Sequence, residues 1–183
     1  MKKVLEIGGW IAGIVLVVFG VIVIAMSWDA RNTVRDSIAQ ENIKFGSIDD
    51  EAVQEYAEDW AGEPVKTGEQ ARAFAKIMRE HITSITGGLT YAEMGRYLSA
   101  DDPENPAGTS NADEALLDSN GDPVPNTARE TWVTETALTT ALNMSYLAEQ
   151  LSVFSTVVGI SLVIVGLGFL VLNWYNVLGP KFG

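Results

Sequence analysis

Two long hydrophobic stretches lie near the two ends of the chain, and a largely polar region separates them. The stretches cover residues 7–28 and 151–174, and neither contains a charged residue. A helix rises about 1.5 Å per residue, so each stretch is long enough to cross a hydrocarbon core of about 30 Å. We therefore predict two transmembrane helices. We expect the first to be an uncleaved anchor, because its apolar run is longer than the core of a usual signal peptide.

Small residues recur every seven positions in both hydrophobic stretches. Seven residues return a helix to within about 20° of its starting face, so each series forms one nearly straight stripe. Lipid gives apolar helices no hydrophobic reason to associate, and stripes of small residues let their backbones approach closely instead. We predict that the two stripes form the packing seam of an antiparallel helix pair; the same seam also suits a homo-oligomer. The seam consists of Gly13, Gly20 and Ser27 in the first stretch, with Gly9 one turn before Gly13, and of Ser152, Gly159 and Gly166 in the second.

The polar region contains several patterns that are typical of helices. Val34 and Ile38 continue an i, i+4 stripe, so we expect the first helix to extend to about Gln40. Four further helix starts have capping-box spacing, in which two side chains three positions apart cap exposed amides. We expect the helix after the last of them to continue without a break through the second hydrophobic stretch. The four pairs are Ser47–Asp50, Thr67–Gln70, Thr90–Glu93 and Thr127–Glu130.

No segment alternates in the manner of a strand, so the predicted fold class is all-α. Two antiparallel transmembrane helices extend outside the membrane and carry a small helical extracytoplasmic domain with a long acidic loop. The loop is placed at residues 99–126, which hold four of the six prolines. The predicted organisation is a cytoplasmic tail at 1–6, a helix at 7–28, the domain at 29–150, a helix at 151–174 and a cytoplasmic tail at 175–183.

The charge of the chain is concentrated in the predicted domain. Residues 29–150 carry 23 of the 24 acids but 9 of the 12 bases, which gives this region a net charge of −14. A surface this acidic argues against nucleic acid and against anionic lipid as partners. The chain has no cysteine, so disulfides, thiol nucleophiles and thiolate metal sites are excluded.

The sequence offers few candidates for chemistry. His81 is the single histidine, and its helical position beside Ile82 favours a partly buried core side chain over a ligand or base. Asp118, Asn120 and Asp122 place oxygen ligands at alternate loop positions, which is a pattern that calcium accepts. Their spacing does not match an EF-hand loop, so a solvated acidic loop is the favoured interpretation. We expect no catalytic residue, no cofactor and no enzyme activity.

Basic residues beside the hydrophobic stretches indicate the orientation. Lys2, Lys3 and Lys181 favour both termini in the cytoplasm, whereas Arg31 and Arg35 favour the opposite orientation. Long acidic domains are translocated largely regardless of such charges, so we expect the central domain to be extracytoplasmic. Neither hydrophobic stretch contains an ionisable residue, so we do not expect a transporter or a channel.

Three strings of the sequence carry a resemblance to a family. They are LEIGGWIAG, TGGLTYAEMGRYL and WVTETALTTALNMSYLAEQLSVF. Together they resemble an uncharacterised family of two-span membrane proteins of actinobacteria, over most of the chain. Some members are labelled aromatic ring-opening dioxygenases, a class that binds iron through two histidines and a carboxylate. This chain has one histidine, so its residues do not support that label. The resemblance implies a bacterial plasma-membrane protein with an exposed helical domain.

These patterns favour a non-catalytic membrane protein that acts in assembly or scaffolding. Its expected partners are the lipid bilayer and either further copies of itself or another membrane protein. One alternative is an accessory subunit of a larger membrane enzyme or transporter complex. Another is a metal-dependent enzyme that uses His81 and acids of the loop.

Overall fold

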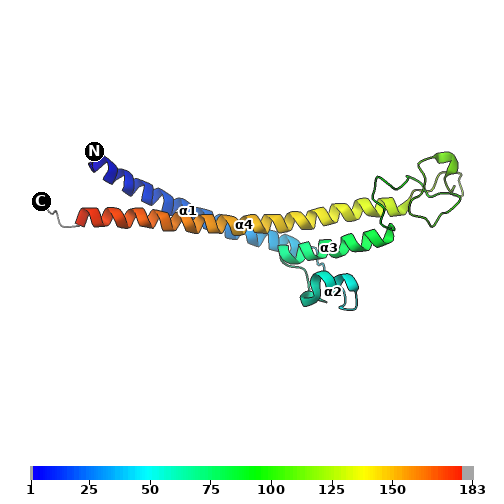
Figure 1. Ribbon diagram of the computed structural model, residues 1–183, viewed down its shortest axis with the longest axis horizontal. Coiled ribbons are helices and arrows are strands. Elements are labelled where there is room, and N and C mark those ends of the chain that lie inside the picture. The colour runs from blue at the N-terminus through cyan, green and yellow to red at the C-terminus, as the bar shows by residue number, and fades with distance from the viewer. Residues whose placement is uncertain (1, 179–183) are drawn as a thin grey trace. The chain divides into compact units, whose positions relative to one another are not determined.

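The computed structural model describes residues 2–178 and is all-helical, as the sequence predicts (Figure 1). No strand is present in this range. The chain forms two compact units. The paired-helix unit contains the described residues up to Asp36 and from Leu147 onward, and the helical unit contains Ser37–Tyr146. The elements are α1 (Lys2–Gln40), α2 (Glu51–Ala57), the 3-10 helix η1 (Glu58–Trp60), α3 (Gly68–Ile85), the 3-10 helix η2 (Ala112–Glu114) and α4 (Thr127–Leu178).

The two long helices have the predicted extents. The first ends at Gln40, and α4 runs unbroken for 52 residues. Both are long and apolar enough to cross a membrane. The predicted tail at 1–6 is helical from Lys2 onward, whereas residue 1 and residues 179–183 of the two predicted tails lie outside the described residues.

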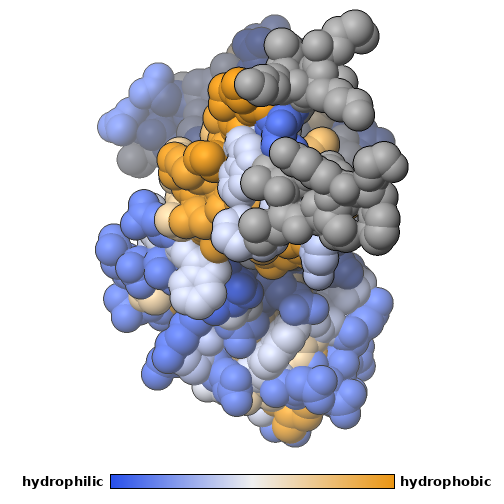
Figure 2. All heavy atoms as spheres, turned by 90° about the vertical axis from the view of Figure 1, so that its left-hand side faces the viewer, coloured by the Kyte–Doolittle hydropathy of each residue, from blue (hydrophilic) through white to orange (hydrophobic). Residues whose placement is uncertain are grey.

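The paired-helix unit exposes most of its large apolar side chains. Only 11% of the most hydrophobic window of either helix is buried, and Phe19 and Leu172 are 56% and 64% exposed. Hydrophobic residues accordingly form part of the molecular surface in Figure 2. A helix that is apolar on all sides requires either a large protein core or a bilayer around it. This unit provides no such core.

The helical unit is built around aromatic and aliphatic side chains between the short helices. The Phe45 ring lies 5.9 Å from the Trp60 ring and 5.8 Å from the Phe74 ring, measured between centroids. Val53 and Ile82 beside them are each 1% exposed. Edge and offset contacts of this kind add to the stabilisation that burial provides. The core therefore joins α2 and α3 to the segment that follows α1.

The capping pairs of the sequence differ in their outcome. The Thr67–Gln70 box is present at the start of α3, as predicted. At α2 the prediction was wrong by three residues, because the Asp50 carboxylate caps the helix by accepting the Ala52 amide, whereas the Ser47 hydroxyl accepts the Asp49 amide in a turn.

The two remaining pairs were also placed imperfectly. Asn126, one residue before Thr127, caps α4 by accepting the Ala128 amide. The Glu93 carboxylate accepts the Thr90 amide and hydroxyl, but the Glu93 amide donates to the Thr90 carbonyl oxygen, and a turn follows instead of the predicted helix. The helix cannot continue there, because the chain extends at once so that the Gly95 amide donates to Ala107.

The loop before α4 is tied together by its own backbone. Isolated antiparallel bridges join Tyr97 to Thr109 and Ser99 to Ala115, and Leu98 donates to Val124. The sequence predicted a long acidic loop here. The structure shows that backbone hydrogen bonds within the loop organise it, which satisfies peptide groups that would otherwise need water.

Candidate functional site

The predicted seam residues lie face to face in the paired-helix unit. A Cβ atom on Gly20 would lie 2.7 Å from the Gly159 carbonyl oxygen, and one on Gly166 would lie 2.8 Å from the Gly13 carbonyl oxygen. Both distances are too short for a side chain, so only glycine permits this approach of the two backbones. The seam therefore pairs α1 with α4 within one chain, antiparallel, and it is not available for a homo-oligomer while it does so.

Polar seam residues extend this contact at both ends. Ser27 and Ser152 are 4% and 6% exposed, and each hydroxyl donates to a carbonyl oxygen of its own helix. At the other end Gly9 lies against the side chain of Asn173, which is 8% exposed and donates to the Phe169 carbonyl oxygen. Their polar groups are satisfied locally, so the contact between the helices depends on shape.

An Arg–Glu cluster, formed by Arg31, Arg35 and Glu149, follows the seam. The Arg31 Nε atom lies 2.9 Å from Glu149 Oε1, and the Arg35 guanidinium lies 2.6 Å from the same oxygen. The glutamate side chain is 7% exposed, whereas the arginine side chains are 45% and 38% exposed. A buried carboxylate requires such pairing, because burial alone disfavours the charge. The cluster was not among the features predicted from the sequence.

His81 is not the core side chain that we predicted. Its side chain is 53% exposed, and its Nε2 atom lies 3.2 Å from the Asp50 carboxylate at the start of α2. The apolar stripe of α3 ends at Ile82, since Ile85 is 59% exposed. The histidine thus joins two surface elements. Among residues 2–178 no group of three or more His, Cys, Asp or Glu side chains could hold a metal ion.

The calcium candidates Asp118, Asn120 and Asp122 form a local turn. The Asp118 carboxylate accepts the Asp122 amide at 2.9 Å and the Asn120 amide at 2.8 Å. These hydrogen bonds hold the pKa of the Asp118 carboxyl below its usual value of 3.8. The carboxylate oxygens are thus directed at their own loop, as in an Asx turn.

Acidification should open this turn only below the usual pKa of an aspartate. Because the pKa of Asp118 is lowered in the folded state, its contribution is present above pH 3.8 and is lost as the pH falls through the lower folded value. An NMR titration of the Asn120 and Asp122 amides should therefore show a midpoint below 3.8, which Asp118→Asn should abolish. A midpoint at or above 3.8 would contradict the hydrogen bonding described.

Cation–π contacts join α3 to the segment of α4 in the helical unit. The Arg72 guanidinium lies 4.6 Å from the Tyr146 ring centroid, and the Arg79 guanidinium lies 4.9 Å from that of Trp132. Each such contact contributes about 0.5–1 kcal/mol where it is solvated and more where it is dry. Two basic residues of this acidic domain, Arg72 and Arg79, therefore lie between α3 and α4.

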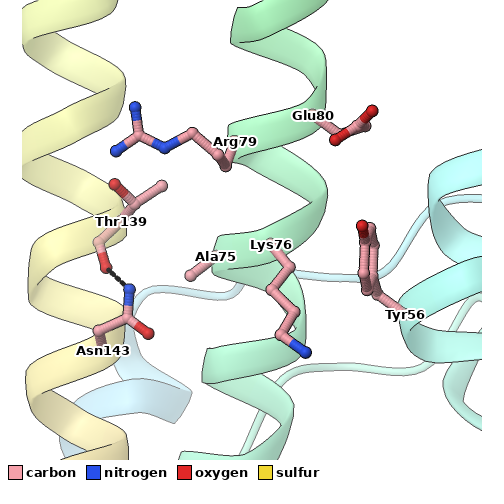
Figure 3. A pocket seen from close by; sticks show the side chains of 7 residues that line it. All are labelled: Tyr56, Ala75, Lys76, Arg79, Glu80, Thr139 and Asn143. Carbon is pink, nitrogen blue, oxygen red and sulfur yellow. Dashed lines mark hydrogen bonds between the residues drawn. The ribbon is translucent and has the colours of Figure 1, made fainter.

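A cavity of about 440 Å³ opens beside these contacts (Figure 3). Arg79 points from α3 toward α4, whereas Tyr56 belongs to α2 on the other side of α3. A hydrogen bond to Glu55 raises the pKa of Tyr56, so its phenol stays protonated at neutral pH. Nothing in this set pairs a nucleophile with a base. The lining residues are Tyr56, Ala75, Lys76, Arg79, Glu80, Thr139 and Asn143.

One side of α4 in the helical unit is both exposed and uncharged. We call it the α4 face. Val133 and Met144 on it are 51% and 58% exposed, and the residues between them are small or hydroxylic. In a region with a net charge of −14, an uncharged helix surface of this length is a candidate contact surface. The α4 face consists of Val133, Ala137, Thr140, Ala141 and Met144.

Comparison of the chain with protein-family models, with curated proteins and with solved structures finds no match.

Proposed function

We propose that this protein is a two-pass protein of the bacterial plasma membrane that acts in assembly rather than in catalysis. The exposed apolar surfaces of α1 and α4 support the membrane location, since water would disfavour them. We place both termini in the cytoplasm and the acidic helical unit outside. A bilayer would then supply the apolar surroundings that the paired helices lack within the chain.

The observation that carries the proposal is the α4 face. Two copies that met through acidic parts of the helical unit would bring like charges together, which is unfavourable. Copies in one membrane share one orientation, so a two-fold axis along the membrane normal brings the same helix face of each copy into contact. Self-association through Val133, Ala137 and Met144 would bury apolar side chains and no charge.

Disulfide cross-linking in native membranes tests this proposal. The chain has no cysteine, so Met144→Cys introduces the only thiol. We expect mild oxidation to give a covalent dimer of Met144→Cys, several-fold above the yield for Ser84→Cys, which is also an exposed position, on α3. Adding Ala137→Glu should abolish the dimer, because the two glutamates would face each other across the contact.

Two other results would overturn the proposal. Equal cross-linking of Met144→Cys and Ser84→Cys would mean that the copies collide at random. Native mass spectrometry of the gently extracted particle provides a second measurement. A stoichiometric second protein, without a second 19.8 kDa subunit, would identify the chain as an accessory subunit.

A further inference from the structure

A second cavity of the helical unit lies where the loop meets the first turn of α4. Its volume is about 250 Å³. It shares Val133 with the α4 face but differs from it in chemistry, because it gathers two arginines in a region whose net charge is strongly negative. The residues that line it are Tyr91, Arg96, Asn126, Arg129, Glu130 and Val133.

The two arginines of this cavity have no acidic partner. Among residues 2–178 the ion pairs within 4.0 Å involve Arg31, Arg35 and His81, and neither Arg96 nor Arg129 takes part in one. Acids outnumber bases by more than two to one in this region, so the lack of a partner is not explained by a shortage of carboxylates. Two unpaired guanidinium groups that share one small cavity attract an anion.

Arg129 has an unsatisfied donor as well as an unpaired charge. Its guanidinium lies 3.9 Å from the centroid of the Tyr91 ring, which covers one face of the planar group. Its N–H groups point outward in the plane of the group, so a stacked ring cannot accept them. The Nε atom is buried and has no hydrogen-bond partner among residues 2–178. Buried donors are rarely left in this state unless a ligand or water serves them.

Asn126 fixes the positions of both arginines. Its side chain donates to the carbonyl oxygens of Gly95 and Pro106, at 3.1 Å and 2.9 Å, and its backbone amide donates to the Arg96 carbonyl oxygen at 2.9 Å. Its side-chain oxygen caps the helix turn that begins at Thr127 and contains Arg129. Asn126 is itself 1% exposed. The cavity is therefore held in place without any ligand, which lowers the entropic cost of binding.

Glycine is required where the loop closes around this asparagine. A Cβ atom on Gly108, whose φ is +56°, would lie 2.7 Å from Asn126 Nδ2. Gly95 packs equally closely against the backbone of Thr109. Both contacts bring the loop against Asn126 and hence bring Arg96 to the start of α4.

We propose that this cavity binds a small oxyanion, a carboxylate or phosphate group of a soluble molecule. The guanidinium fork presents parallel N–H donors that match the two oxygens of such a group. The free Nε donor of Arg129, the charge of Arg96 and the positive end of a 52-residue helix all favour it. Glu130 lowers the positive charge of the cavity without cancelling it.

Calorimetric titration of the purified full chain in detergent tests the proposal. The probes are inorganic phosphate and succinate, each added at constant ionic strength. We expect saturable binding of at least one probe, weakened at least tenfold by Arg96→Gln and by Arg129→Gln. Glu130→Gln should strengthen binding several-fold, because it removes the like charge. Arg72→Gln, which affects an arginine stacked on Tyr146, should leave binding unchanged.

Arg96 is exposed, so we expect Arg96→Gln to keep the fold. It therefore tests the proposal even if Arg129→Gln, which removes the stack on Tyr91, disturbs the fold. Circular dichroism of each variant checks this. Absence of saturable binding of both probes would overturn the proposal. Equal weakening by Arg72→Gln would also overturn it, since binding would then reflect overall charge alone.

Discussion

Gly20→Val is expected to destabilise the paired helices by about 1–3 kcal/mol, the usual cost of overpacking a tight contact. A Cβ atom at this position would lie 2.7 Å from the Gly159 carbonyl oxygen and 2.8 Å from the Val163 side chain. Backbone atoms cannot move aside as a flexible side chain can, so the two helices must separate. The loss of unfolding free energy can be measured for the full chain in mild detergent by steric trapping.

Gly168→Val provides the matched control for this experiment. Gly168 lies in the apolar segment of the partner helix α4, but a Cβ atom there would meet nothing within 4 Å. The two substitutions therefore make the same chemical change and differ in the space available. Equal losses at Gly20 and Gly168 would show that helix propensity, and not the seam, governs the effect.

Replacing Arg31 and Arg35 together with glutamine should destabilise the same unit by about 3–5 kcal/mol. The double substitution removes both arginine charges that lie beside the Glu149 carboxylate, which is 7% exposed. Glu149→Gln alone should cost less, about 1–3 kcal/mol, because the two half-exposed arginines that remain can be hydrated. The expected order of the two losses follows from which partner is buried.

The triple variant Arg31→Gln, Arg35→Gln, Glu149→Gln distinguishes charge from packing. It should recover part of the stability that the double variant loses, since it also removes the buried charge of Glu149. Unfolding of the three variants under one condition provides the comparison. If the triple variant were no more stable than the double variant, the arginines would act through their aliphatic stems instead.

The long helices were predictable because their signals are local and repeated. The stripe of Val34 and Ile38 predicted that α1 continues to Gln40, and Ile38 is 4% exposed in the structure. No proline or glycine interrupts α4 between Thr127 and Gly159, so its continuity followed from composition. The heptad spacing of small residues likewise identified Gly13, Gly20, Gly159 and Gly166, and Gly9 was found one turn before Gly13.

Errors occurred where two neighbouring groups compete for one role. Ser47 and Asp50 are both good capping residues, and the sequence does not show that the chain turns at Ser47 before α2 begins. His81 has the helical position of a core residue, but it lies on the same side of α3 as the exposed Ile85, whereas Ile82 and Thr86 on the adjoining side stay buried. Where a neighbouring element stops is a property of the tertiary structure.

The Arg–Glu cluster and the arginine cavity depend on contacts between distant parts of the chain. Arg31 and Glu149 are 118 positions apart, so their pairing appears only once α1 and α4 are aligned. A signal was nevertheless present, because Glu149 lies three residues before Ser152, on the seam side of its helix. Arg96 and Arg129 meet through an irregular loop whose path no periodicity predicts.

The heptad spacing of the seam also fixes how the two long helices can move. Registers that mesh equally well differ by seven residues, which is about 10.5 Å along the helix axis. Any smaller slide would drive the side chains of Val163 and Leu170, which flank the glycines, into the opposing backbone. The pair is therefore locked against piston motion. Movement of one end reaches the other only as a tilt or rotation of both helices together.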